Sequence, residues 1–260
     1  MNFGIFGSFP IAGIFVGILL LILFSCEVGY RFGKRARTDQ DKEAPSSIGA
    51  MVGGLLGMLG FVLAFTFSMA SSQHDLRKQN VLDEANSIGT AYLRADLIDQ
   101  QYGIEVKRLL REYVDVRLQA ASGRGLDAAL ARSSEIQNLV WTQVSSAAVA
   151  SPNTNTSLMI QSVNDVIDMH EKRLTGALRN RIPDNVWIAL IAITVLTMTT
   201  LGVLVGFTGK RRPAEVVALS LAFAVLVTLV VDLDRPQSGL ITVGQQSMHE
   251  LQSNMARGTK

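Results

Sequence analysis

The residues best placed to do chemistry in this 260-residue chain are two carboxylates at the end of a long apolar run. In "VVDLDRPQSGLI", Asp232 and Asp234 precede Arg235, and Pro236 and Gly239 then favour a sharp turn. If the run is a helix, its dipole disfavours anions at this end, and Arg235 offsets only one carboxylate. We call Asp232, Asp234 and Arg235 the boundary charge cluster, and it is the leading candidate for a functional polar site.

Three interpretations of the boundary charge cluster are open, because charged groups near a bilayer need partners or a function. The first is a structural clasp, in which the acids pair with Arg235 or with a basic residue such as Arg179 or Arg181. The second is a ring of carboxylates at the outer mouth of a pore. The third is a divalent-cation site on Asp232 and Asp234. We favour the clasp.

The rest of the chain offers no sign of an enzyme. It has no glycine-rich phosphate loop, no HExxH, no CxxC and no nucleophile elbow. The histidines His74, His170 and His249 lack metal-ligand spacing, and Cys26, the single cysteine, excludes an intramolecular disulfide. A net charge of +2 gives no case for nucleic acid. We predict no enzymatic activity, no metal and no cofactor.

Composition places the chain in a membrane. It is 48% hydrophobic and 18% charged, with a mean hydropathy of +0.28. Four apolar stretches approach the ~20 residues that a helix needs to cross a bilayer. We predict an all-α membrane protein with four transmembrane helices in two hairpins and an extramembrane helical bundle inserted between spans two and three. The lipid bilayer is therefore the first expected partner.

The predicted domains follow these stretches. Residues 1–70 form the first transmembrane hairpin, with spans at about 11–30 and 48–70, and residues 71–185 form the extramembrane helical domain that continues from span two. Residues 186–233 form the second hairpin, with spans at about 186–207 and 214–232, and residues 234–260 form a C-terminal tail.

Basic residues predict the orientation. Both short links between spans are basic, and short basic links stay in the cytoplasm. Their basic residues are Arg31, Lys34, Arg35, Arg37 and Lys42 in the first link and Lys210, Arg211 and Arg212 in the second. We predict a cell inner-membrane protein whose N-terminus, middle domain and C-terminus lie outside the cytoplasm.

Span two continues into the middle domain without a break. Apolar residues recur every three or four positions from Val81 to Ala95, with no proline, so residues 48–96 are predicted to form one helix. Three further helices are expected at 103–120, 126–148 and 158–181. Tyr113 and Arg117 lie on the apolar side of the first, and His170 lies on that of the third, where a buried structural role is expected.

Two faces of span two are candidate sites. Small residues three or four positions apart allow close helix packing, either within the fold or between subunits; they are Gly49, Gly53, Gly57, Gly60 and Ala64. A neighbouring face could contact lipid or a partner helix, or form an apolar constriction that gates by dewetting; its residues are Met58, Phe61, Phe65 and Met69.

Three stretches carry a resemblance to a known family. They are "GFVLAFTFSMASSQHDLRKQNVLDEANSIGTAYLRADLI", "LLREYVDVRL" and "LVVDLDRPQSGLITVGQQ". Together they resemble bacterial membrane proteins with a bestrophin-like domain, a resemblance that spans most of the chain. It implies similarity to bestrophins, which are pentameric ion channels with a neck lined by apolar side chains of the second transmembrane helix. Phe61 and Phe65 match that neck in position and type.

The resemblance also implies a cytoplasmic middle segment, whereas the two basic links place it outside, and we prefer the charge rule. The leading functional hypothesis is an oligomeric inner-membrane ion channel or passive pore with its constriction on span two, which the resemblance implies is a pentamer. The alternative is a non-conducting envelope sensor or scaffold that binds a partner through its extramembrane helical domain.

Overall fold

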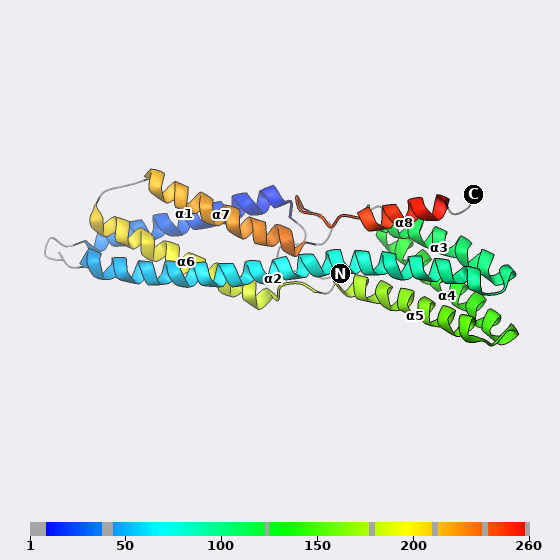
Figure 1. The fold of residues 1–260 in the computed structure, drawn as a ribbon. Helices are drawn as coiled ribbons and strands as arrows, with labels where there is room; N and C mark the ends of the chain where they lie inside the picture. The colour runs from blue at the N-terminus through cyan, green and yellow to red at the C-terminus, as the bar shows by residue number, and fades with distance from the viewer. Residues whose placement is uncertain are drawn as a thin grey trace. The chain divides into compact units, whose positions relative to one another are not determined.

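The structure is a computed structural model that describes residues 9–37, 44–122, 125–176, 180–209, 213–235 and 239–257. All of the regular structure in these ranges is helical, which confirms the all-α prediction. The elements are α1 (Ile11–Ala36), α2 (Ala44–Arg94), η1 (Ala95–Leu97), α3 (Gln100–Ala121), α4 (Leu126–Ala150), α5 (Thr154–Leu174), α6 (Asp184–Thr208), α7 (Pro213–Asp234) and α8 (Gln246–Arg257) (Figure 1).

The chain divides into two compact units. The first unit holds residues 1–73 and 181–241, and the second holds residues 74–180 and 242–260. Four helices are long and apolar enough to cross a membrane: α1, the N-terminal part of α2, α6 and α7. These are four candidate membrane-spanning helices, in the number that the sequence predicted. Helix α2 continues beyond its candidate span as one 51-residue helix, as its periodicity predicted. The arrangement as two hairpins stays a prediction.

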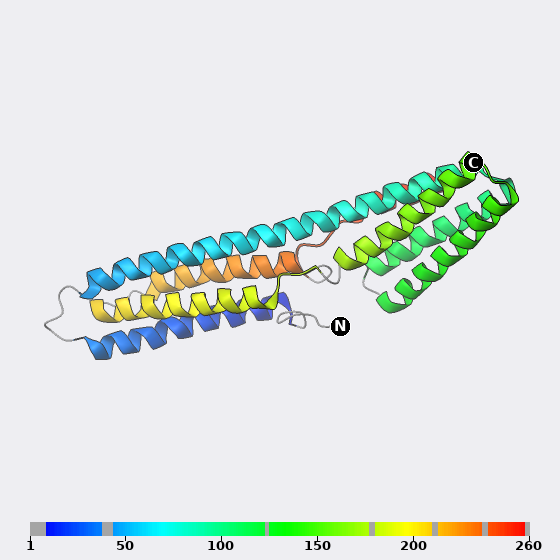
Figure 2. The ribbon, with the colours of Figure 1, turned by 90° about the horizontal axis from the view of Figure 1, so that it is seen from below.

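In the first unit, α1 packs along α6 through glycines, and the two helices lie side by side (Figure 2). A Cβ atom on Gly29 would lie 2.0 Å from the carbonyl oxygen of Thr199, and one on Gly202 would lie 2.1 Å from that of Cys26. Gly33 and Gly206 are equally confined by the backbone of the facing helix. Two glycines four residues apart on each helix thus bring the two backbones into direct contact, as in small-residue packing in membranes.

In the second unit, the C-terminal part of α2 packs with α3, α4 and α5 around an apolar core. The predicted C-terminal tail also contributes, because residues 246–257 form helix α8. Met248 and Met255, which lie two turns apart on α8, are buried in this core. The hydroxyl of Tyr92 donates to the carbonyl oxygen of Met255 at 3.4 Å. Part of the predicted tail is therefore a structural element of the helical domain.

The glycine contact between α1 and α6 is testable with two matched substitutions on one helix. Gly29→Ala forces the α1 and α6 backbones apart and should destabilise the protein by about 1–3 kcal/mol. Gly17→Ala, also on α1, meets nothing within 4 Å and should be neutral or slightly stabilising. Thermal unfolding of the purified protein in detergent compares the two. Equal unfolding temperatures would contradict the backbone contact.

Candidate functional site

Helix α2 has two opposite faces in the first unit. Leu59, Leu63 and Ala70 are buried and belong to the core of this unit. On the other side, Phe61 is 74% exposed and Phe65 is 61% exposed. Met58 is also exposed, and Met69 is half-buried. The four predicted constriction residues thus lie on the side of α2 that faces away from the core of its own unit, and Met69 is the most covered of them.

The glycine stripe of α2 lies beside this face and is open. The stripe contains Gly49, Gly53, Gly57 and Gly60, and a Cβ atom built on any of them would meet nothing within 4 Å. Ala64, which continues the stripe, is exposed. At these glycines there is thus open space rather than a close neighbour among the described residues. Packing between copies of the chain stays a prediction.

We call the stripe and the constriction residues together the open face of α2. Each glycine in a helix interior costs about 1 kcal/mol relative to alanine, and close helix packing is what offsets this cost in a membrane. Phe61 and Phe65 on the same open face add a large apolar surface. Both properties are typical of a helix face that packs against another helix or lines a symmetry axis between copies of the chain.

The boundary charge cluster has a different environment, since all three of its residues are buried. The Asp232 carboxylate accepts the backbone N–H of Leu240 at 2.9 Å and that of Ile241 at 2.8 Å. A Cβ atom on Gly239 would lie 2.1 Å from Oδ1 of Asp232. Asp232 therefore holds the segment that follows α7, and only glycine fits at position 239.

The other two members of the cluster reach different segments. Oδ1 of Asp234 accepts the backbone N–H of Ile182 at 2.9 Å, just before α6 begins. A guanidinium N–H of Arg235 donates to the carbonyl oxygen of Phe9 at 2.8 Å, just before α1 begins. These contacts favour the structural clasp over a pore mouth or a cation site, because the carboxylate oxygens already accept N–H groups. Arg179 lies outside the described residues.

Arg235 lies close enough to both acids for their charges to attract it, as the clasp interpretation expected. The backbone N–H groups that also bind the two carboxylates are additional partners, which a sequence pattern does not reveal. Among the described residues, no group of three or more histidine, cysteine or acidic side chains lies close enough together to hold a metal ion.

The second unit contains a buried ionic network that the sequence only partly indicated. The Glu84 carboxylate on α2 is fully buried, 2.8 Å from Nε of Arg117 on α3, and it also pairs with Arg173 on α5. The Tyr113 hydroxyl donates to Glu84 at 3.1 Å and lies 3.0 Å from Nδ1 of His170. In the sequence, Arg117 and His170 stood out as polar residues on the apolar sides of predicted helices. Only the three-dimensional structure shows that both belong to one network with Glu84.

Burial and charge set the protonation of this network. Burial raises the pKa of the Glu84 carboxyl, but attraction to Arg117 and Arg173 outweighs it, so that pKa is lowered. Burial, with repulsion from Arg117, lowers the pKa of His170 to about 4. Burial and the Glu84 charge raise the pKa of Tyr113. Near neutral pH the carboxylate is charged and the imidazole and phenol are neutral, which suits a structural link between helices.

The all-helical fold and its four long apolar helices define a class of multi-pass helical membrane protein. A family model described as "Bestrophin-like domain" matches residues 16–248. The chain therefore belongs to the bestrophin-like family, as the sequence resemblance indicated. A search of curated proteins gives no match.

Solved structures show the same fold at low sequence identity. Two mutants of a bacterial bestrophin homologue from Klebsiella pneumoniae are similar, with TM-scores of 0.64 and 0.61 and identities of 14% and 13%. In each case the match covers 96% of this chain and 98% of the other. A crystal structure described only as that of a membrane protein matches with a TM-score of 0.57 at 14% identity, over 95% of this chain and 96% of the other.

The clasp at Asp232 is tested by two glycine substitutions in the segment that follows α7. Gly239→Ala drives a methyl group into the Asp232 carboxylate and should destabilise the protein by about 1–3 kcal/mol. Gly244→Ala meets nothing within 4 Å and serves as the control. Thermal unfolding in detergent measures both. If Gly239→Ala is as stable as the control, the clasp does not hold this segment.

The low pKa of His170 predicts a pH dependence of stability. In the unfolded chain the pKa of His170 is about 6.5, whereas in the folded protein it is about 4. The unfolded state therefore binds the proton first, and stability should decrease as the pH falls from about 6.5 towards about 4. Unfolding temperatures recorded over this range measure the effect.

A second histidine provides the control for this experiment. His170→Asn keeps a polar group near the Nδ1 position and should flatten the acid-side loss of stability. His249→Asn changes an exposed histidine and should leave the loss unchanged. Identical pH profiles for the wild type and His170→Asn would contradict the assignment.

Proposed function

We propose that this protein is a homo-oligomeric ion channel or passive pore of the bacterial inner membrane, with the open face of α2 turned towards the symmetry axis. The observation that carries the proposal is the two-sided burial of α2. One side packs into the chain's own core, and the other presents Phe61 and Phe65 to the outside. Membership of the bestrophin-like family and the similarity to bacterial bestrophin homologues support it.

The proposed gate follows from the physical properties of the open face. When several copies of α2 surround an axis, Phe61 and Phe65 form two successive rings one helical turn apart. Water confined between apolar rings is unstable, and without it an ion must lose its hydration shell to pass. The constriction is then closed to ions without a physical plug, and a small widening of the rings opens it.

The glycine stripe supplies the second half of the mechanism. Gly53 and Gly57 offer no side chain beyond the helix backbone, so an adjacent α2 helix can approach closely there. Close approach keeps the ring of copies narrow at the level of Phe61. The subunit number is proposed to be five by family analogy, and the orientation predicted from the two basic links stays a prediction.

Planar-bilayer recording of the purified protein tests this function. The wild type should give single-channel currents, and Phe61→Ala together with Phe65→Ala should raise the current or the open fraction several-fold, because the apolar barrier to hydrated ions is lowered. Phe67→Ala is a matched control, since Phe67 lies about 120° from Phe61 around the helix.

Each outcome of the recording has a clear meaning. An unchanged current in the Phe61 and Phe65 variant, with a normal wild-type channel, would place the constriction elsewhere. Silence in both proteins would remove the channel hypothesis and leave the non-conducting sensor or scaffold, which binds a partner through its helical domain.

A further inference from the structure

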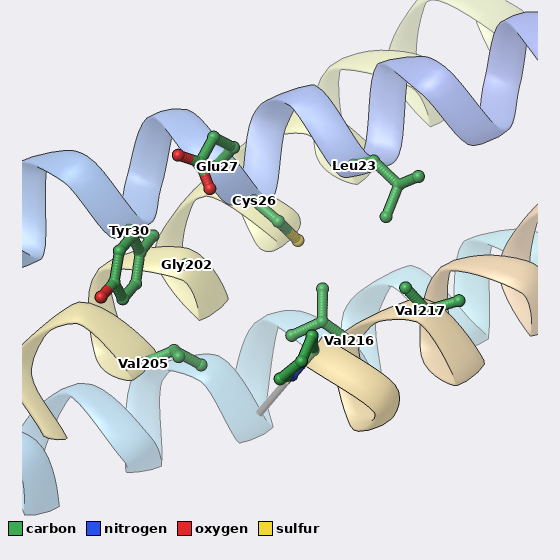
Figure 3. A pocket seen from close by; sticks show the side chains of 9 residues that line it. Leu23, Cys26, Glu27, Tyr30, Gly202, Val205, Val216 and Val217 are labelled. Carbon is green, nitrogen blue, oxygen red and sulfur yellow. The ribbon is translucent and has the colours of Figure 1, made fainter. Parts of the chain in front are cut away.

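The first unit contains an apolar pocket that the proposed channel does not use. It has a volume of about 300 Å³ and lies among α1, α6 and α7. Figure 3 shows the side chains of Leu23 and Cys26 on α1 facing Val216 and Val217 on α7 across the pocket. Glu27, Tyr30, Gly202, Val205 and Pro213 complete its lining. The pocket reaches the size range of small-molecule sites, and its wall is mostly apolar, with Glu27 and Tyr30 as its polar members.

One end of the pocket leads to basic residues. Its α1 residues, from Leu23 to Tyr30, recur with helical spacing, so they lie on one face of α1. Lys34 is one turn beyond Tyr30 and about three turns beyond Leu23, which places it on the same face. Arg35 lies about 100° away around the helix. Lys34 and Arg35 are both exposed basic residues. They differ in that Lys34 lies on the pocket face of α1 and Arg35 does not.

Among the described residues of α1 near the pocket, Lys34 is the basic residue on the pocket face, and the basic residues Arg31 and Arg37 have other contacts. Arg31 pairs with Glu27 at 2.9 Å, so the acid at the edge of the pocket is neutralised by its own helix. The Arg37 guanidinium lies against Gly209, immediately after the last turn of α6, where a cation stabilises the negative end of the helix dipole. A lysine directly beyond an apolar pocket combines a hydrocarbon site with an anion site.

We propose that the pocket binds an anionic phospholipid, with part of one acyl chain between α1 and α7 and the headgroup phosphate at Lys34. The proposal is independent of the channel function. A phospholipid is favoured because the pocket lies among membrane-spanning helices, where acyl chains surround the protein. Anionic character follows from Lys34, because a basic residue near a membrane surface attracts anionic lipid by about fivefold in affinity.

The lysine half of the proposal is tested by native mass spectrometry of the full-length protein in detergent, with added phosphatidylglycerol or phosphatidylcholine. The wild type should retain phosphatidylglycerol in preference to phosphatidylcholine. Lys34→Gln should weaken phosphatidylglycerol binding about fivefold, whereas Arg35→Gln should change it little. Equal loss in the two variants would mean a diffuse electrostatic attraction and would overturn the site.

The pocket half is tested by filling it. Val217→Phe places a larger side chain in the pocket and should abolish the preferential binding. Val225→Phe is the matched control on α7, because Val225 is exposed and does not line this pocket. If Val217→Phe binds phosphatidylglycerol like the control, or if it changes only the number of copies in the assembly, the pocket is not a lipid site and the proposal fails.

Discussion

The backbone contact between α1 and α6 is the constraint on which the first unit depends. Gly29, Gly33, Gly202 and Gly206 let the two helices touch without intervening side chains. Lipid tails are as apolar as leucine, so helices in a bilayer associate through close packing rather than through a hydrophobic driving force. These four glycines therefore join α1 to α6 within the chain. The glycines of α2, which meet no neighbour in the described part of the chain, need a different explanation.

This division of roles connects the fold to the proposed function. If the α2 glycines packed within the chain, Phe61 and Phe65 would lie near an internal contact and would offer no surface to an axis. Instead, the buried side of α2 anchors it to the core, and its open face holds both glycines and aromatic rings. In the second unit, Glu84 on the same helix is fixed by Arg117 and Arg173. Each half of α2 thus has its own attachment to the helices around it.

The sequence predicted what depends on local periodicity and composition. The unbroken helix from 48 to 96, the four apolar spans and the buried position of His170 are visible in the order of apolar residues, and the structure contains each. Features that depend on partners were not visible. Gly29 and Gly33 carry the same small-residue spacing as α2, but only the facing Gly202 shows that they are in contact. Helix α8 was missed because it is short and polar, with two buried methionines.

The boundary charge cluster shows how a partner changes the meaning of a residue. Two acids at the negative end of a helix dipole left a clasp, a pore mouth and a cation site open, and each acid accepts backbone N–H groups from outside its own helix. Those donors lie close to the crossings between the two units: Ile182 follows one crossing directly, and Ile241 precedes another. The cluster therefore fixes both segments inside the first unit, next to the points where the chain enters or leaves it. Because a buried carboxylate is stabilised by such bonds, Asp232 and Asp234 are better understood as anchors of the chain path than as ligands for an ion.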